Sequence, residues 1–131
     1  MKKLYYASFF YMVAGLLLGV FYREFTKIND FVGVTQLSTT HTHAFALGMI
    51  FLLIVLTLEK TFTLSSVKGY DKWFILYNLG LVGVIGTMVT RGTLQVLGSD
   101  FAGLNHIAGL MHATFGISVV WFFLILKKKI N

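Results

Sequence analysis

Four long apolar runs alternate with short polar segments along the 131 residues of the chain. Each run is about as long as the ~20 residues that an α-helix needs to cross a bilayer, and the chain contains no proline to interrupt them. The pattern predicts transmembrane helices over residues 4–22, 40–58, 73–90 and 101–126. We therefore expect an all-α integral membrane protein, one domain over residues 1–131, folded as an up-down-up-down four-helix bundle.

Composition supports a membrane protein over a soluble one. Hydrophobic residues make up 56% of the chain, charged residues only 12%, and the mean hydropathy is +0.78. A soluble domain of this length does not need so much apolar residue, whereas several membrane spans do. The chain has no cysteine, which excludes disulfides, iron–sulfur clusters, thiolate-ligated haem and the covalent attachment of c-type haem.

The net charge of +6 predicts orientation and not nucleic-acid binding, because the basic residues lie at the ends of the runs. One end of the predicted bundle holds eight lysines: Lys2, Lys3, Lys60, Lys68, Lys72, Lys127, Lys128 and Lys129. The other end holds Arg23, Lys27 and Arg91. The positive-inside rule then places both termini in the cytoplasm, in a multi-pass protein of the plasma membrane.

Glycines mark where helices can approach each other closely. Gly15 and Gly19 form a G-x-x-x-G pattern in the first run, while Gly80, Gly83 and Gly86 recur at every third position of the third run. We interpret both sets as packing positions. The first set also offers a face for a homo-oligomer.

The fourth run carries small and polar residues around a histidine. Asn105, Gly109, His112 and Gly116 are spaced so that they share one face of a helix. A glycine on each side of an imidazole leaves a flat slot for a planar ligand, although packing against another helix would explain the same spacing.

All four histidines fall near the same end of the predicted bundle. His41 and His43 enter the second run, and His106 and His112 enter the fourth. An ionisable residue inside a membrane span is a functional-site hypothesis by default. Counted from Leu58 and Leu126 at ~1.5 Å per residue, His43 and His112 lie at nearly equal heights, about 22 and 21 Å.

These features favour a bis-histidine b-type haem, as in a cytochrome b-like electron-transfer or haem-handling protein. Helices two and four would be diagonal neighbours roughly 12–14 Å apart, with His43 and His112 as axial ligands. Gly109 and Gly116 would make room for the macrocycle, and Arg91 and Arg23 would bind propionates. His41 and His106, nearer the rim, would serve as alternative ligands, propionate contacts or proton partners of a quinol.

The stretch His41-Thr-His-Ala-Phe-Ala-Leu-Gly48 resembles the histidine-bearing second helix of the haem–copper oxidase catalytic subunits, closest to the cbb3-type and nitric-oxide-reductase branches and to NnrS-like proteins. The resemblance implies that His41 or His43 is an axial haem ligand. The chain lacks the further helices and the three-histidine copper site of an oxidase. Over its full length it also resembles a family of small, uncharacterised four-span bacterial membrane proteins, which implies a bacterial membrane location.

Two other classes of function remain open. Three or four of the histidines would supply nitrogen ligands to copper or zinc in a metal-binding or transport protein. Alternatively, glycine faces that dock other helices would suit a non-catalytic accessory or assembly subunit, including one of a respiratory chain. Hydrolytic chemistry is disfavoured, since no carboxylate pair or nucleophile–base pair falls within the apolar runs; an enzymatic redox role stays open.

Overall fold

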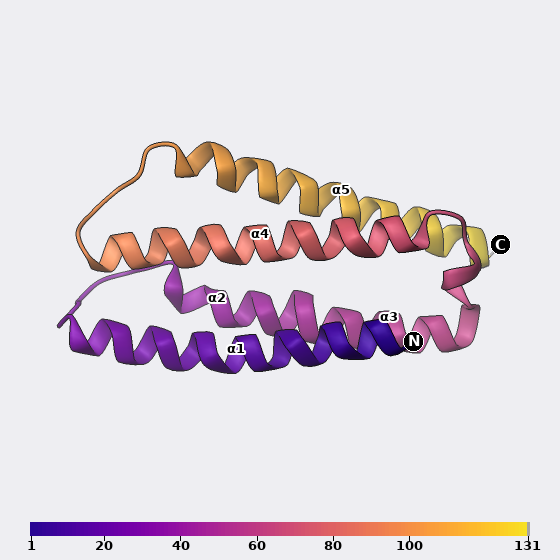
Figure 1. The fold of residues 1–131 in the computed structure, drawn as a ribbon, viewed down its shortest axis with the longest axis horizontal. Helices are drawn as coiled ribbons and strands as arrows, with labels where there is room; N and C mark the ends of the chain where they lie inside the picture. The colour runs from indigo at the N-terminus through magenta and orange to yellow at the C-terminus, as the bar shows by residue number, and fades with distance from the viewer. Residues whose placement is uncertain (131) are drawn as a thin grey trace.

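The computed structural model describes residues 1–130, and that part of the chain forms helices with no strand (Figure 1). The first helix is α1 (Lys2–Ile28). The second long helix is continuous but changes type, from α2 (Leu37–His43) through the π-helix η1 (Ala44–Ile50) to α3 (Phe51–Phe62). A short 3₁₀ turn, η2 (Leu64–Ser66), leads to α4 (Tyr70–Val96), and α5 (Leu104–Ile130) follows.

The prediction of four long apolar helices is confirmed: each of the four is long and apolar enough to cross a membrane. They run further than the predicted spans, because the flanking polar residues continue the helical turns. Residues 23–28, expected to belong to a connecting loop, are the last turns of α1, which ends where Asp30 adopts a left-handed φ of 48°. In contrast, α5 begins three residues later than predicted.

The helices alternate in direction, so both termini lie at the same end of the molecule (Figure 1). We call this the terminal end; it also holds the connection from Glu59 to Tyr70. The opposite end contains α2, the last turns of α4 and the first turns of α5. It carries all four histidines and is called the histidine end. The predicted up-down-up-down order of helices is confirmed.

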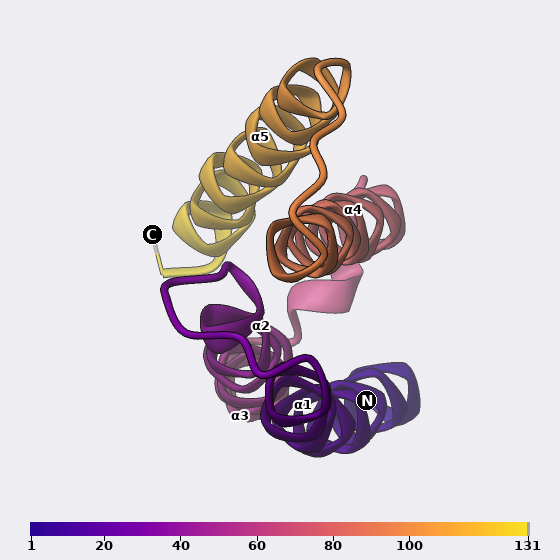
Figure 2. The same cartoon turned by 90° about the vertical axis from the view of Figure 1, so that its left-hand side faces the viewer.

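The closed square bundle implied by that order is not what forms. α1 packs on α2, η1 and α3, α2 also packs on α4, and α4 packs on α5. Viewed along the helices, α1 and α5 lie on opposite sides of the molecule (Figure 2). Helices two and four are therefore not diagonal partners across a closed core.

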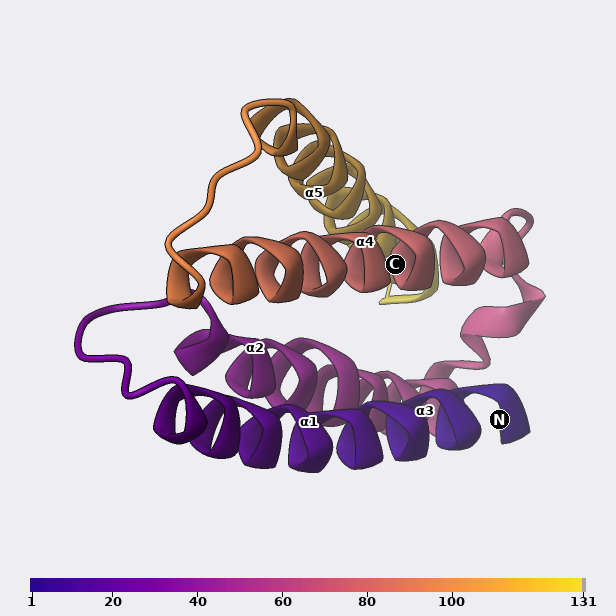
Figure 3. The ribbon, with the colours of Figure 1, turned by 60° about the vertical axis from the view of Figure 1, so that its left-hand side comes forward.

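α5 crosses α4 and then leaves it. A Cβ added to Gly80 of α4 would lie 2.8 Å from the backbone of Phe115, and one added to Gly83 would overlap the Met111 side chain. Toward the histidine end a Cβ on Gly86 would meet nothing within 4 Å. The first turns of α5 lean away from α2 (Figure 3).

The closely packed core lies in the terminal half. Its centre is aromatic: Trp73, fully buried, contacts Tyr70, Tyr77 and Phe122, and its indole N–H donates to the carbonyl of Ser118 at 2.9 Å. Phe51 stacks on Tyr77 with ring centroids 4.9 Å apart and meets Phe122 edge-on. These rings connect α3, α4 and α5 in one cluster.

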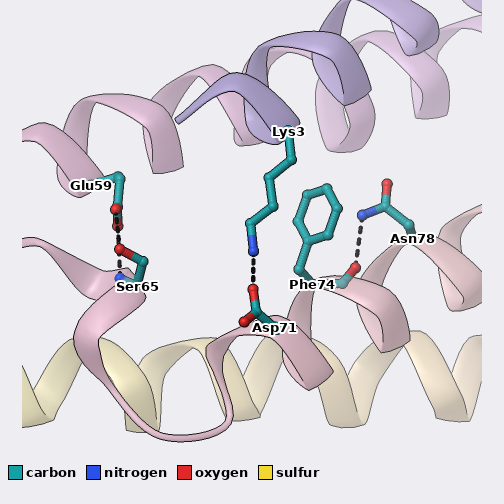
Figure 4. Close-up of polar contacts among 6 residues, drawn as sticks. All are labelled: Lys3, Glu59, Ser65, Asp71, Phe74 and Asn78. Carbon is teal, nitrogen blue, oxygen red and sulfur yellow. Dashed lines mark hydrogen bonds and ion pairs between the residues drawn. The ribbon is translucent and has the colours of Figure 1, made fainter.

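Polar contacts close the terminal end (Figure 4). The buried Glu59 carboxylate accepts hydrogen bonds from the backbone N–H and the hydroxyl of Ser65, at the start of the connection to α4. Lys3 of α1 pairs with Asp71 at the first turn of α4. These contacts join α1 and α3 to the start of α4.

Candidate functional site

The π-helix begins directly after His43. Within it, the Leu47 carbonyl accepts a hydrogen bond from the Tyr77 hydroxyl of α4 at 2.8 Å. Gly48 lies in the same segment, and a Cβ there would fall only 2.2 Å from the Tyr11 side chain of α1. The segment is therefore held from two sides. π-turns of this kind are frequent at functional sites.

The same feature changes the height estimated for His43. That estimate assumed the α-helical rise from Leu58 upward, but Ala44–Ile50 is a π-helix. A π-helix has more residues per turn and therefore less rise per residue. The equal heights of His43 and His112 thus do not follow from residue counting.

His43 and His112 share one local geometry. Nδ1 of His43 lies 2.9 Å from the carbonyl oxygen of Thr39, and Nδ1 of His112 lies 2.8 Å from that of Ala108. A carbonyl oxygen only accepts, so in each neutral imidazole Nδ1 must carry the proton. The lone pair is then on Nε2, which is free to bind a metal. Metal-ligating histidines typically donate their other ring N–H in this way.

The remaining two histidines differ from this pair. Nδ1 of His41 is buried without a hydrogen-bond partner, and its ring stands edge-on to Phe45 with centroids 6.4 Å apart. His41 faces α1, where a Cβ on Gly19 would lie 3.9 Å from its Cβ and Cγ. His106 is exposed on the first turn of α5. Neither resembles the Nδ1-anchored pair.

The structure brings all four histidines to one end but does not gather them into a cluster. Among residues 1–130, no group of three or more His, Cys, Asp or Glu side chains could hold a metal ion. α5 packs on α4 and has no comparable contact with α2 or η1. His43 and His112 therefore stand on helices that meet in the terminal half, through Phe51 and Phe122, but do not pack on each other near the histidines.

The slot predicted beside His112 is open. A Cβ added to Gly109 or to Gly116 would meet nothing within 4 Å, and His112 itself is exposed. These glycines therefore do not serve close packing within the chain, unlike Gly80. The part of this face formed by Gly109, His112 and Gly116 remains open to a ligand or another molecule.

The two arginines predicted near the site have different surroundings. Arg91 donates to the side-chain oxygen of Asn105 and so connects the end of α4 to the start of α5. Arg23 is exposed and lies 3.4 Å from Glu24. Arg91 is thus on the same side as the His112 face, while Arg23 belongs to α1.

The G-x-x-x-G pattern of α1 is used inside the chain. A Cβ on Gly15 would lie 2.7 Å from the Phe45 ring, and Gly19 adjoins His41. The pattern therefore seats the histidine-bearing helix against α1. Homo-oligomer formation stays a prediction.

Tyr77 was not singled out from the sequence, although it contacts both histidine-bearing helices. Its hydroxyl holds Leu47, four residues after His43, and its ring lies 5.1 Å from that of Phe115, three residues after His112. A tyrosine in an apolar run carries a donor that needs a partner. That was the available signal, but it could not indicate which carbonyl the hydroxyl reaches.

Comparison with known proteins identifies a family and no function. No curated protein and no solved structure matches the chain. The similarity of residues 41–48 to haem–copper oxidases and NnrS-like proteins therefore rests on that short motif alone. A family model covers residues 1–129. The chain belongs to the family described as "Protein of unknown function (DUF2871)".

Proposed function

We propose that the chain is a multi-pass protein of the bacterial plasma membrane, with both termini in the cytoplasm. Four apolar helices of 26 or 27 residues support this placement. Large apolar side chains are exposed along their outer faces, among them Leu17 of α1, Leu79 of α4 and Leu110 of α5. The eight lysines of the terminal end give the charge asymmetry that the positive-inside rule requires.

We further propose that this protein binds b-type haem through Nε2 of His43 and Nε2 of His112. The observation that carries the proposal is the shared Nδ1 hydrogen bond to a backbone carbonyl, 2.9 Å in one helix and 2.8 Å in the other. It selects the same tautomer in both residues and leaves the same nitrogen free. Two neutral imidazoles with free Nε2 atoms are the ligand set of a six-coordinate haem.

The surroundings of the two histidines fit such a group. Gly109 and Gly116 leave space on either side of His112. Arg91 and Arg23, two of the basic residues of the histidine end, would pair with propionates. Bound haem would supply one-electron chemistry. The chain itself would hold the two ligand tautomers and exclude water with its apolar helices, which suits electron exchange with a quinol or a respiratory partner.

The test is an absorption spectrum of the detergent-purified protein, oxidised and reduced, after expression with ample haem. We expect a sharp reduced α-band that is lost in His43→Ala and in His112→Ala. His106→Ala is the matched control, since it removes an exposed imidazole of α5 that lacks the carbonyl bond, and it should keep the band. A colourless wild-type protein would overturn the haem proposal.

Two further outcomes separate the other functions. A colourless protein with stoichiometric copper or zinc, lost in the same two variants, would favour a metal-binding or transport protein. A colourless, metal-free protein would favour an accessory or assembly subunit.

The open slot gives a second test of the same proposal. Gly109→Leu and Gly116→Leu fill space beside His112 that no other residue occupies. Both variants should unfold like the wild type but bind less haem. Gly86→Leu, on the open part of α4, is the control for adding the same side chain elsewhere. If haem content is unchanged in all three variants, the slot plays no part in binding.

A further inference from the structure

A basic hollow lies at the terminal end, far along α5 from His112. It has a volume of about 400 Å³ and is bordered by three lysines, Lys68 before α4 and Lys127 and Lys128 near the end of α5. Its apolar wall is formed by Trp121, Leu124 and Ile125. Three cationic groups around one hollow make a site for an anionic group such as a phosphate.

An apolar groove of about 800 Å³ lies next to this hollow along α5. The two adjoin, because Trp121 and Leu124 line both of them. Beyond the shared residues the groove is lined by Ala113, Gly116, Ile117 and Val120. The small residues at its far end deepen it, and every residue of its lining is uncharged.

The connection before α4 shapes the wall of the hollow. Gly69 adopts a left-handed φ of 98°, and a Cβ there would approach the Trp121 ring to 3.3 Å. Glycine permits both the turn and the close approach of the indole. The same turn places the adjacent Lys68 at the mouth of the hollow with Lys127 and Lys128.

The described residues place no acidic side chain beside these lysines. Within residues 1–130, the lining of the hollow and of the groove contains no Asp or Glu. Asp71 is paired with Lys3 of α1, and Glu59 accepts hydrogen bonds from Ser65. Among residues 1–130, then, no carboxylate competes with an anion for the three lysines of the hollow.

We propose that this hollow and groove together bind one anionic phospholipid, with its phosphate between Lys68, Lys127 and Lys128 and an acyl chain in the groove of α5. A basic hollow with an apolar extension matches a molecule that has an anionic head and an apolar tail. The proposal rests on the membrane placement given above and is tested without haem, although Gly116 borders both this groove and the slot beside His112. The lysines lie at the end that this placement puts in the cytoplasm, where anionic lipids attract basic residues.

The two tryptophans of the chain make the site measurable. Trp73 is fully buried in the core, whereas Trp121 lines both cavities. The full-length protein would be placed in phosphatidylcholine vesicles containing a small fraction of lipid with brominated acyl chains, which quench tryptophan on contact. We expect brominated phosphatidylglycerol to quench several-fold more strongly than brominated phosphatidylcholine at the same mole fraction. Trp121→Phe should remove most of that difference.

Lysine-to-glutamine variants then test whether the preference for phosphatidylglycerol arises from this hollow. Lys68→Gln, Lys127→Gln and Lys128→Gln combined should abolish the preference for phosphatidylglycerol. The matched control combines Lys2→Gln, Lys60→Gln and Lys72→Gln, which removes the same charge from the same end, including the smaller hollow beside Lys2 and Lys60. The control should keep the preference.

Each contrary outcome is decisive. Equal quenching by the two brominated lipids, or equal loss in both triple variants, would overturn the lipid site while leaving the membrane placement intact. A protein that neither lipid quenches would not be in the bilayer, and both proposals would fail.

Discussion

The two halves of this molecule are built from equally apolar helices but are packed differently. In the terminal half, Trp73, Tyr77, Phe51 and Phe122 interlock across three helices. In the histidine half, α5 leaves α4, and a Cβ added to Gly86, Gly109 or Gly116 would meet nothing within 4 Å. The terminal half has the features of a stable core, while the histidine half has the features of an open site for a ligand.

The difference shows what drives packing between apolar helices. Hydrophobicity alone does not distinguish the halves, because in a membrane lipid is as apolar as leucine and close packing must hold helices together. Gly80 allows backbone contact with Phe115, and buried hydroxyl and indole donors find carbonyl partners on neighbouring helices. Toward the histidine end, beyond these close contacts and hydrogen bonds, α5 separates from α4.

The largest loss of stability is expected when the central ring of the terminal half, Trp73, is replaced. Trp73→Ala removes a fully buried indole and its hydrogen bond to Ser118, so it should lower the free energy of unfolding by about 3–5 kcal/mol. Phe123→Ala, an exposed aromatic of α5, should change it by less than about 0.5 kcal/mol. Denaturant titration in detergent measures both. A similar loss in the two variants would show that the terminal cluster is not the core.

Replacing either of two glycines of α4 with alanine should change the stability by a smaller amount, and the two changes should have opposite signs. In Gly80→Ala the new methyl would lie 2.8 Å from the backbone of Phe115, which should cost about 1–3 kcal/mol by overpacking. Gly86→Ala meets nothing within 4 Å and should stabilise the helix by about 0.5–1 kcal/mol. Midpoints of thermal unfolding should therefore move in opposite directions. If both fall, α5 must approach α4 at Gly86 as well.

The smallest loss of stability is expected for the hydrogen bond from the Tyr77 hydroxyl to the Leu47 carbonyl. Tyr77→Phe leaves the half-buried Leu47 carbonyl without its side-chain partner, at a cost of about 0.5–1.5 kcal/mol. Tyr70→Phe is the matched control, because its buried hydroxyl has no partner to lose. The Leu47 carbonyl, labelled with ¹³C and followed by infrared spectroscopy, should shift in frequency only in the Tyr77 variant. No shift would mean that the π-turn is held by other contacts.

Much of the fold could be predicted because its signals are local. The apolar runs indicate four helices, and the interpretation of Gly15, Gly80 and Gly83 as packing positions is confirmed, whereas the same interpretation of Gly86 is wrong. The sequence did not predict that Gly15 packs against Phe45 of the same chain, because the residues of a single segment do not indicate which distant segment it contacts. The open arrangement of α5 was missed for the same reason.

The candidate site divides in a similar way. The four histidines and the end that they occupy followed from their positions in the apolar runs. The distinction between His43 and His41, two residues apart, could not: one ring reaches back to Thr39, and the other is enclosed against α1. Rotation about the helix axis and the rotamer decide that difference, and both depend on the neighbouring helix.

By itself, then, the sequence determined the number of helices, their alternating direction and the concentration of histidines at one end and lysines at the other. These properties depend on residue type and spacing along a single segment. The tertiary structure alone decided the π-turn after His43, the separation of α5 from α2 and the basic hollow beside Trp121. Each of these depends on contacts between segments that are distant in the chain, where small differences in packing select one arrangement.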